Sequence, residues 1–438
     1  MKIYKKIMQI FLLIFINTTS IAAVSISSEN PNIVNISANN NIALKKTITK
    51  LIIPKPQINV ASYVLVDSDS GKVIASKSLN QQREIASLTK LMTLYITFNE
   101  LRNHIITLNQ IVIVSQKAHN MNGSKMFLKD GQKVTIEQLI QGIIVDSGND
   151  ASVLLAQTIG GSEESFVNLM NQQAQELGMI DTHFTNPTGL PNVKSFSTAH
   201  DLAILTRAII QHYSQYYHYF SKKWLVFNSI KQPNRNRLLW KYATADGLKT
   251  GHTEEAGYCL ISSAKKNNMR LIAVVLGAKS DQQRTMASIH LLDYGFNYFK
   301  TVKLLSNELH IAKIRSFYGK QKYFIAGINK DLYLTMPKLY YKNAQLKVNI
   351  DRSMLAPVHR GISVGKINVI ANNKVQVSQN IIALEDVKMT NILQQLIDYI
   401  NYKIYNLWPF KKQLSTELIL NINDDLMKEI KQKLHESA

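Results

Sequence analysis

Two clusters of strand-forming residues that lie far apart in the sequence constrain the fold of this chain more than any other feature. Residues 61–76 have the pattern of a β-hairpin, with a β-branched and aromatic run, turn residues and an alternating segment. A second strand cluster covers residues 257–277, whereas residues 87–220 carry apolar residues at helical spacing. We therefore predict an α+β domain over residues 58–299, in which both ends of the segment build one antiparallel sheet, flanked by helices, with an inserted helical block. A helix over residues 281–298 would close this domain.

The pattern changes after residue 301, where short β-rich segments are separated by Gly, Pro and Asn. These segments predict a small all-β domain over residues 301–387, in which we find no group of residues suited to catalysis. The final segment, 409–438, has a weaker helical signal from four apolar residues spaced by four, and its role is open. Those residues are Ile422, Leu426, Ile430 and Leu434.

Residues 389–408 have the pattern of an amphipathic helix that ends at Pro409. When this segment is projected as a helix, its large apolar residues gather on one face and its polar residues fall outside it. The apolar face consists of Leu393, Leu396, Ile397, Ile400, Ile404, Leu407 and Trp408. Such a helix is expected to lie in the lipid interface without spanning the membrane. The alternative is a helix packed on its own β domain.

The N-terminus has the three-part pattern of a secretory signal peptide. Lysines precede an apolar run, residues 7–16, and a stretch with small residues ends at Ala23. We predict a signal peptide over residues 1–23, followed by a linker over residues 24–57. An uncleaved membrane anchor is the alternative, although the apolar run is short for a bilayer span. In either case the rest of the chain is exported.

Net charge limits the class of partner. The chain has 51 Lys and Arg against 30 Asp and Glu, a formal net charge of +21, so an anionic partner is expected. The basic residues are scattered in ones and twos, which is typical of a solvated surface. Export argues against nucleic acid and leaves anionic lipid and acidic cell-wall polymer. The single cysteine, Cys259, excludes an intrachain disulfide and a cysteine-built metal site. We expect neither a metal nor another cofactor.

The pattern Ser-x-x-Lys occurs four times, so position must select among the copies. The copies begin at Ser87, Ser262, Ser263 and Ser363. Only Ser87 opens an evident helix, in which positions three apart share a face and Lys90 can reach the serine hydroxyl. The helix N-terminus adds positive potential and free backbone N–H groups, which favour an oxygen anion. Ser87 and Lys90 are therefore the predicted activated nucleophile and its partner.

Two further short motifs follow in the chain. Ser147-Gly148-Asn149 comes directly after an apolar run, residues 139–145. Lys249-Thr250-Gly251 is the only Lys-Thr-Gly in the chain and lies just ahead of the second strand cluster.

In this order the three motifs resemble those of the penicillin-binding-protein and serine β-lactamase superfamily. The resemblance is closest to the low-molecular-mass D-Ala-D-Ala carboxypeptidases, on residues 86–93, 182–190 and 246–257. It implies a β-lactamase/DD-peptidase-like fold for residues 58–299. One departure is Thr188, where many relatives have His, and no mechanism is attached to it. A second is the length of the tail after Pro409.

The resemblance implies a serine acyl-enzyme. Ser87 attacks the carbonyl of the penultimate D-Ala, and Lys90, kept neutral by burial beside other cations, accepts the proton. Ser147 relays a proton towards the leaving amine. Asn149 hydrogen-bonds either Lys90 or the substrate amide.

The same resemblance assigns the far wall of the site. Lys249 and Thr250 pair with the terminal carboxylate of the substrate, and Gly251 permits close approach of the substrate backbone. The oxyanion hole would use the backbone N–H groups of Ser87 and His252. The His252 side chain is expected to shape the pocket.

Two arginines complete the implied substrate site. Arg284 matches a carboxylate-binding arginine of these carboxypeptidases, and Arg235 matches another basic residue near their site. The alternative for each is an ordinary surface arginine.

We therefore expect a D-Ala-D-Ala carboxypeptidase that trims peptidoglycan stem pentapeptides and is acylated and inhibited by β-lactams. Its expected location is the periplasmic face of the inner membrane, as a peripheral protein held to lipid by the helix at 389–408. A β-lactamase is less favoured, because no segment resembles the loop that carries the deacylating glutamate of class A enzymes. Some transpeptidase activity stays open, as does oligomeric state. A catalytically silent cell-wall scaffold is the alternative from another class, and penicillin labelling would distinguish it.

Overall fold

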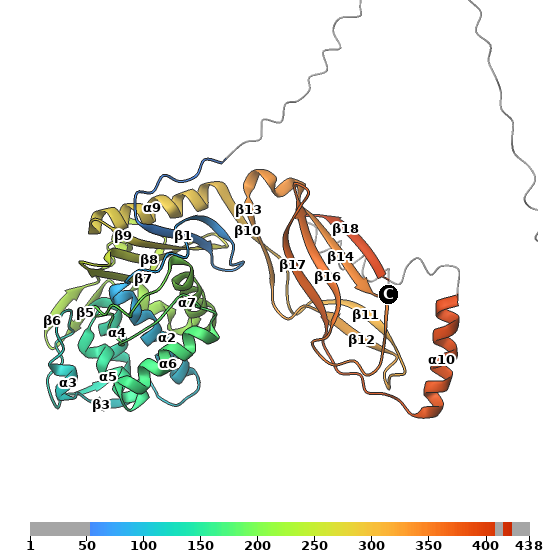
Figure 1. Cartoon of the computed structure of the whole chain (residues 1–438), viewed down its shortest axis with the longest axis horizontal. Helices are drawn as coiled ribbons and strands as arrows, with labels where there is room; N and C mark the ends of the chain where they lie inside the picture. The colour runs from blue at the N-terminus through green and yellow to red at the C-terminus, as the bar shows by residue number, and fades with distance from the viewer. Residues whose placement is uncertain (1–52, 408–414, 423–438) are drawn as a thin grey trace, which may run out of the picture. The chain divides into compact units, whose positions relative to one another are not determined.

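The computed structural model describes residues 53–407 and 415–422 (Figure 1). The predicted signal peptide (1–23), the predicted linker up to residue 52, and the tail apart from residues 415–422 lie outside the described residues.

A five-stranded antiparallel sheet forms the centre of the first domain, in the order β2-β1-β9-β8-β7. As predicted, it joins the two distant strand clusters, because β1 pairs with β2 from its own hairpin and with β9 from the second cluster. The edge strand β7 carries the Lys-Thr-Gly motif. The strands are β1 (Ser62–Asp67), β2 (Val73–Lys77), β7 (Ala245–Thr253), β8 (Gly257–Lys266) and β9 (Met269–Ala278).

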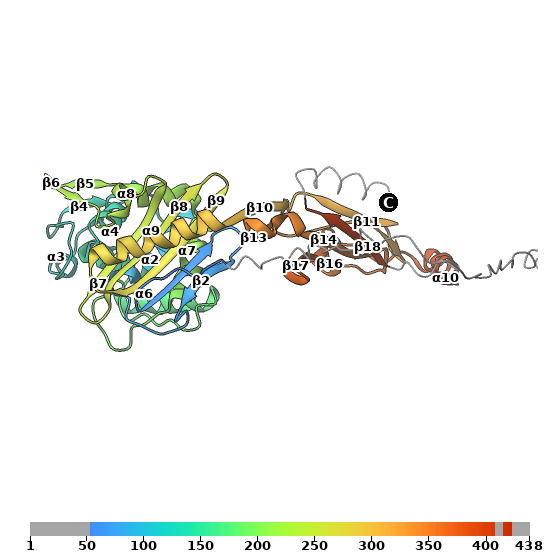
Figure 2. The same ribbon diagram turned by 90° about the horizontal axis from the view of Figure 1, so that it is seen from above.

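Helices cover both faces of this sheet (Figures 1 and 2). Every residue of β1 is buried, because successive side chains of a strand point to opposite faces and each face has its own core. Val64 belongs to the core shared with the helical block, whereas Leu65 packs in a second core with Leu291 of α9 (Asp281–Tyr298). Helix α9 is the closing helix expected from the sequence.

The inserted block is helical, as predicted, but it also contains short strands. Three-residue strands β3 and β4 pair with each other, and strands this short carry too little alternation to be read from the sequence. The helices are η1 (Ala86–Thr89), α2 (Lys90–Arg102), α3 (Gln116–His119), α4 (Ile136–Val145), α5 (Asn149–Gly160), α6 (Glu163–Glu176), α7 (Ala199–His212), η2 (Ser214–Ser221) and α8 (Leu238–Lys241). The short strands are β3 (Ile111–Ile113), β4 (Lys133–Thr135), β5 (Trp224–Phe227) and β6 (Ile230–Pro233).

The second domain is all-β, as predicted, with its own apolar core. A seven-stranded sheet has the order β15-β11-β12-β17-β16-β14-β18, and β10 pairs with β13 separately. The elements are β10 (Phe299–Leu305), β11 (His310–Phe317), β12 (Tyr323–Gly327), β13 (Leu332–Pro337), η3 (Lys338–Asn343), β14 (Gln345–Asp351), β15 (Ser353–Leu355), β16 (Ser363–Ala371), β17 (Lys374–Ala383) and β18 (Ser415–Asn421).

Strand β18 shows that part of the tail belongs to the β domain, a role that the sequence left open. Residues 415–421 pair with β14 along its whole length. Of the four residues that carry the helical signal, Leu426, Ile430 and Leu434 lie outside the described residues. Leu420 and Ile422 are buried in the β-domain core, whereas Ile419 is exposed, so the inward side chains recur every second residue. The β domain therefore includes part of the tail.

Helix α10 (Ile392–Leu407) is the amphipathic helix predicted over residues 389–408. One side of it contacts β11 and the turn that follows: the ring of Tyr402 lies 5.2 Å from that of Phe317, and Asp398 Oδ2 accepts a hydrogen bond from the backbone N–H of Tyr318. Among the described residues, no helix combines the length and the hydropathy needed to cross a membrane.

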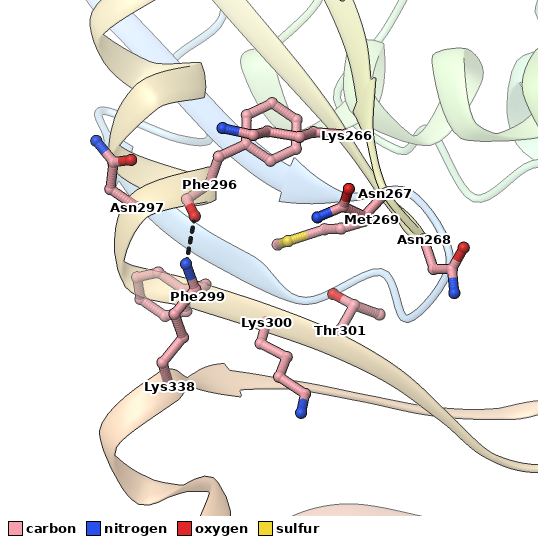
Figure 3. A pocket seen from close by; sticks show the side chains of 10 residues that line it. All are labelled: Lys266, Asn267, Asn268, Met269, Phe296, Asn297, Phe299, Lys300, Thr301 and Lys338. Carbon is pink, nitrogen blue, oxygen red and sulfur yellow. Dashed lines mark hydrogen bonds between the residues drawn. The ribbon is translucent and has the colours of Figure 1, made fainter.

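A pocket of about 340 Å³ lies where α9 leads into β10 (Figure 3). Lys338 Nζ donates to the backbone carbonyl of Phe296 at 2.8 Å, which places a cation beside the C-terminal end of α9. The pocket is lined by Lys266, Asn267, Asn268, Met269, Phe296, Asn297, Phe299, Lys300, Thr301 and Lys338. These side chains do not pair a nucleophile with a base, so the candidate active site lies elsewhere.

Candidate active site

The sequence suggested that Ser87 lies in the first turn of an α-helix. In the structure it lies in the short 3-10 helix η1. The 3-10 helix runs directly into α2, whose first residue is Lys90. Ala86, just before the serine, has a φ of 48°, in the left-handed region that non-glycine residues seldom occupy. This tight turn leaves Lys90 Nζ 2.9 Å from Ser87 Oγ. The predicted serine and lysine are thus in hydrogen-bond contact.

The buried amine of Lys90 has two further partners. It donates to Asn149 Oδ1 at 2.7 Å and to the backbone carbonyl of Thr188. A neutral amine has two N–H groups and one lone pair, and these two acceptors occupy both N–H groups. The lone pair is then left for the Ser87 hydroxyl, which is the arrangement that a general base requires.

Electrostatics favours the neutral form of this lysine. The pKa of Lys90 is lowered to about 7, chiefly by burial and then by the charge of Arg235, while Asp150 opposes the shift. The lysine is thus poised to exchange a proton near neutral pH.

The loop at residues 186–189 places the Thr188 carbonyl. Asn186 Oδ1 accepts hydrogen bonds from the backbone N–H groups of Thr188 and Gly189 and from the Thr188 hydroxyl. Gly189 has a φ of +76°, and a Cβ there would lie 1.9 Å from the carbonyl oxygen of Ala86, so only glycine fits. Thr188 therefore contributes its backbone carbonyl to the site, and its hydroxyl is used within the loop.

A second serine–lysine pair lies across the site. Ser147, between α4 and α5, has a φ of 59°, and its Oγ accepts a hydrogen bond from Lys249 Nζ at 2.8 Å. Lys249 is buried on the edge strand β7. Its pKa is well below the ordinary value, first because of burial and then because of the charges of Lys90, Arg235 and Arg284.

These groups surround a pocket of about 240 Å³. Seven residues predicted from the sequence line it, together with Ser124, which was not predicted. The lining residues are Ser87, Ser124, Ser147, Arg235, Thr250, Gly251, His252 and Arg284. Behind this lining, Lys90 contacts Ser87, and Lys249 contacts Ser147. The His252 ring stacks on that of Tyr258 with 3.9 Å between centroids.

Arg284 reaches the pocket from α9, but most of its donors are already used. Its guanidinium donates to the backbone carbonyls of Gly251 and Cys259 and pairs twice with Asp281. Of its five N–H groups, one is left for a substrate. Arg235 lines the same pocket and is exposed.

Ser124 carries no local sequence signal. Its backbone carbonyl accepts a hydrogen bond from the Asn149 N–H at 2.7 Å, and the Asn149 side chain donates to the carbonyl of Asn122. The segment around Ser124 is therefore held in the site by a residue distant in the sequence, which a local pattern does not reveal.

A serine that faces a buried lysine of lowered pKa, with a second serine and lysine on the opposite wall, is the arrangement of a serine peptidase that works through an acyl-enzyme without a histidine base. More specifically, the chain belongs to the D-alanyl-D-alanine carboxypeptidase family, whose sequence pattern matches residues 49–280. A second match, to the C-terminal domain of penicillin-binding protein 5, covers residues 299–389. The predicted family, fold class and serine carboxypeptidase activity are confirmed.

Individual proteins agree with the family assignment. The chain is 39% identical to the D-alanyl-D-alanine carboxypeptidase DacD of Salmonella typhimurium over 356 residues, 80% of this chain and 91% of that protein. It resembles penicillin-binding protein 5 from Haemophilus influenzae with a TM-score of 0.72 and 37% identity, over 77% of this chain and 100% of that one. A more distant structure is penicillin-binding protein D2 from Listeria monocytogenes in its ampicillin-bound form. Its TM-score is 0.51 at 26% identity, over 56% of this chain and 99% of that chain.

Proposed function

We propose that this carboxypeptidase removes the terminal D-Ala from peptidoglycan stem pentapeptides through an ester on Ser87. The observation that carries the assignment is the buried Lys90 amine, which lies 2.9 Å from Ser87 Oγ and also contacts Asn149 Oδ1 and the Thr188 carbonyl. When this amine is neutral, the last two acceptors take both of its N–H groups and leave the lone pair for Ser87. Lys90 takes the hydroxyl proton as Oγ bonds to the carbonyl carbon of the penultimate D-Ala. The backbone N–H groups of Ser87 and His252, which line the same pocket, stabilise the oxyanion.

The second serine–lysine pair serves the leaving group. When the peptide C–N bond breaks, Ser147 passes a proton to the departing amine of D-Ala and is replenished by Lys249, to which it is hydrogen-bonded. The proton that Lys90 took during acylation then passes to Lys249, which returns both lysines to their starting states. Water attacks the ester, again with Lys90 as base, and the tetrapeptide leaves as the ester C–O bond breaks. The proton taken by Lys90 in this step restores the Ser87 hydroxyl.

The cations of the pocket select a free carboxylate. Arg284 offers one N–H group and its charge, Thr250 offers a hydroxyl, and the exposed Arg235 faces the rim. A bidentate clamp by Arg284 alone is not available, because its other donors are committed within the protein. The carboxylate of the terminal D-Ala is therefore bound by several groups, each contributing a small part.

The pocket also fits β-lactams. These compounds place a strained amide carbonyl next to a carboxylate, as an acyl-D-Ala-D-Ala substrate does, so Ser87 is the residue that they should acylate. A relative of similar fold has been seen with ampicillin bound.

The test of this proposal is Ser87→Ala. The variant should lose labelling by fluorescent penicillin and should lose D-Ala release by roughly 10⁴-fold or more. Ser363→Ala, at an exposed Ser-x-x-Lys serine of the β domain, is the matched control and should label normally. Stoichiometric labelling of the Ser87→Ala protein would contradict the assignment.

The apolar face of α10 supports a membrane-bound location. Leu393, Leu396 and Ile400 are 73%, 60% and 59% exposed, while the opposite side of the helix contacts β11 and the turn after it. Apolar side chains exposed along one helix face are costly in water and favourable in a lipid interface. We place the protein on the periplasmic face of the inner membrane, as a peripheral protein exported by its N-terminal segment.

A further inference from the structure

A set of exposed aromatic and basic side chains on the β5–β6 hairpin and α8 takes no part in the mechanism above. We call it the hairpin surface, and it consists of Lys223, Trp224, Val226, Lys231 and Trp240. Trp224 and Trp240 are 48% and 42% exposed, although tryptophan is highly buried on average. The hairpin lies at the periphery of the peptidase domain (Figures 1 and 2).

The two indole rings form a corner. Their centroids are 6.0 Å apart and their planes meet at 82°. Lys231 Nζ lies 4.8 Å from the centre of the Trp224 ring, and Lys223 Nζ lies 5.9 Å from that of Trp240. Each indole thus has an ammonium group over one face and is still about half exposed. Such a surface suits a ligand that has C–H groups for the exposed aromatic area and negative charge for the ammonium groups.

Two connections join the hairpin to segments that line the active-site pocket. Trp224 is paired with Pro233, only two residues before Arg235 on the pocket rim. In addition, Gln232 donates a hydrogen bond to the backbone carbonyl of Lys125, the neighbour of the pocket residue Ser124.

Further hydrogen bonds fix the hairpin in place. The backbone N–H of Asn234 donates to the carbonyl of Lys223 at 2.8 Å, and the Asn228 side chain donates to the carbonyl of Phe127 at 2.8 Å. The indole pair is thus held at a fixed position relative to the pocket, as a binding surface for one substrate requires.

We propose that the hairpin surface binds the glycan strand from which the stem peptide projects, as an extension of the catalytic site. This inference rests on the proposed function, because it is a stem peptide bound at Ser87 that would bring its glycan strand near the hairpin. The sugar rings present C–H faces to Trp224 and Trp240, and the carboxylates of neighbouring stem peptides meet Lys223 and Lys231. The chain as a whole, with a formal net charge of +21, favours such an anionic polymer.

The test compares two substrates of the double variant Trp224→Ala/Trp240→Ala. One is a diacylated tripeptide ending in D-Ala-D-Ala, which has no sugar, and the other is uncross-linked glycan strands that carry stem pentapeptides. D-Ala release from the strands should fall roughly tenfold in kcat/KM, mainly through KM, while release from the tripeptide stays unchanged. Trp224→Phe should retain part of the activity on strands.

Tyr323→Ala is the matched control, because Tyr323 is also an exposed aromatic residue with a lysine, Lys313, 5.1 Å from its ring centre, but it lies in the β domain. It should change neither rate. Equal rates of the double variant and the wild type on strands would overturn the inference, as would an equal loss on both substrates. If the double variant no longer binds lipid vesicles but releases D-Ala from strands at the wild-type rate, the inference is also overturned. The hairpin surface would then be assigned to the membrane. Absence of D-Ala release from the tripeptide by the wild type would instead contradict the proposed function.

Discussion

Lys90 must be neutral when it accepts the Ser87 proton, so its pKa sets the pH dependence of acylation. With that pKa near 7, acylation by labelled penicillin should accelerate as the pH rises through about 7 and level off above it. After burial, Arg235 is the largest influence that lowers this pKa. Arg235→Gln should therefore raise the pKa of Lys90 and move the rising limb to higher pH. Arg237→Gln, at an exposed arginine two residues away, should leave the limb in place; an unmoved limb in both variants would contradict this account.

Asp146 is a second titrating group beside the site. It immediately precedes Ser147, it is buried, and none of the described residues hydrogen-bonds its carboxylate oxygens. Burial raises the pKa of Asp146 to about 7, against the opposing charges of Arg235 and Lys249. Because the folded-state pKa lies above the unfolded value, the stabilising contribution is complete below the unfolded pKa, near 4, and is lost as the pH rises through about 7.

Asp146→Asn should therefore stabilise the protein at alkaline pH. Relative to the wild type, its free energy of unfolding should rise between about pH 5 and pH 8, by about 1 kcal/mol or more. In the wild type the Asp146 carboxylate also raises the pKa of Lys249, so the variant should hold less protonated Lys249 at pH 8. Because Lys249 supplies the proton to Ser147, D-Ala release should slow at pH 8 and change little at pH 5. Thermal unfolding and steady-state kinetics at both pH values measure these effects. Asp130→Asn, at an exposed carboxylate, should show neither; a pH-independent change in Asp146→Asn would contradict the explanation.

For individual residues, the sequence predicted the side chains that the structure brings together at the pocket and missed the groups that hold them. Ser87, Ser147 and Lys249 could be chosen because each belongs to a short motif with a suitable position. The Thr188 carbonyl and Ser124 reach the site through contacts between distant segments, which leave no local pattern. The hydrogen bonds of Arg284 within the protein could not be predicted either. An arginine side chain indicates a carboxylate partner, but the sequence does not show how many of its donors the fold already uses.

Among the secondary-structure elements, β18 is the one whose removal should be most informative. Leu420 is 1% exposed in the β-domain core, whereas its neighbour Ile419, on the opposite face of the strand, is 53% exposed. Leu420→Ala should lower the free energy of unfolding of the β domain by about 2–5 kcal/mol, and Ile419→Ala should change it little. Chemical denaturation followed by circular dichroism distinguishes them. Similar losses in both variants would show that β18 is not packed as the structure has it.

Periodicity explains what could be predicted at the level of elements. Residues 136–145 repeat apolar residues with helical spacing and begin with the reciprocal Thr135 and Gln138 cap, so α4 could be predicted. Strand β18 was not predicted, because its place in the sheet depends on pairing with β14, a non-local contact. The helical signal of the tail stays a prediction, since Leu426, Ile430 and Leu434 lie outside the described residues.

For the whole molecule, the separation of strand clusters at the two ends of the peptidase domain was enough to predict one sheet with a helical insertion. The strand order could not be predicted from the sequence. In the structure β1 lies between β2 and β9, and β9 is the last strand of the second cluster. The order depends on which apolar faces fit together in the two cores, and composition and alternation do not encode it.

The proposed membrane location of the protein rests on the exposed face of α10. Strand β18 follows α10 in the chain and belongs to the sheet and core of the β domain. A truncation before residue 389 would therefore also remove this strand. Loss of membrane binding could then result from damage to the β domain. Leu396→Lys/Ile400→Lys avoids this problem, since both side chains are exposed. Both proteins are tested without residues 1–23. The wild type should sediment with anionic vesicles and this variant should not. The added lysines would by charge alone strengthen binding to anionic lipid, so a loss of binding can be assigned to the lost apolar surface.

Asn401→Lys, on the polar side of the same helix, adds charge without removing apolar surface and should sediment as the wild type does. All three proteins should release D-Ala from a soluble tripeptide at the same rate, because the substitutions are in the β-domain appendage and Ser87 is in the peptidase domain. If Leu396→Lys/Ile400→Lys still sediments, α10 is not the anchor. If the full-length chain with that double substitution stays in the membrane fraction of cells while the shortened form does not, the N-terminal segment is uncleaved and holds the protein there.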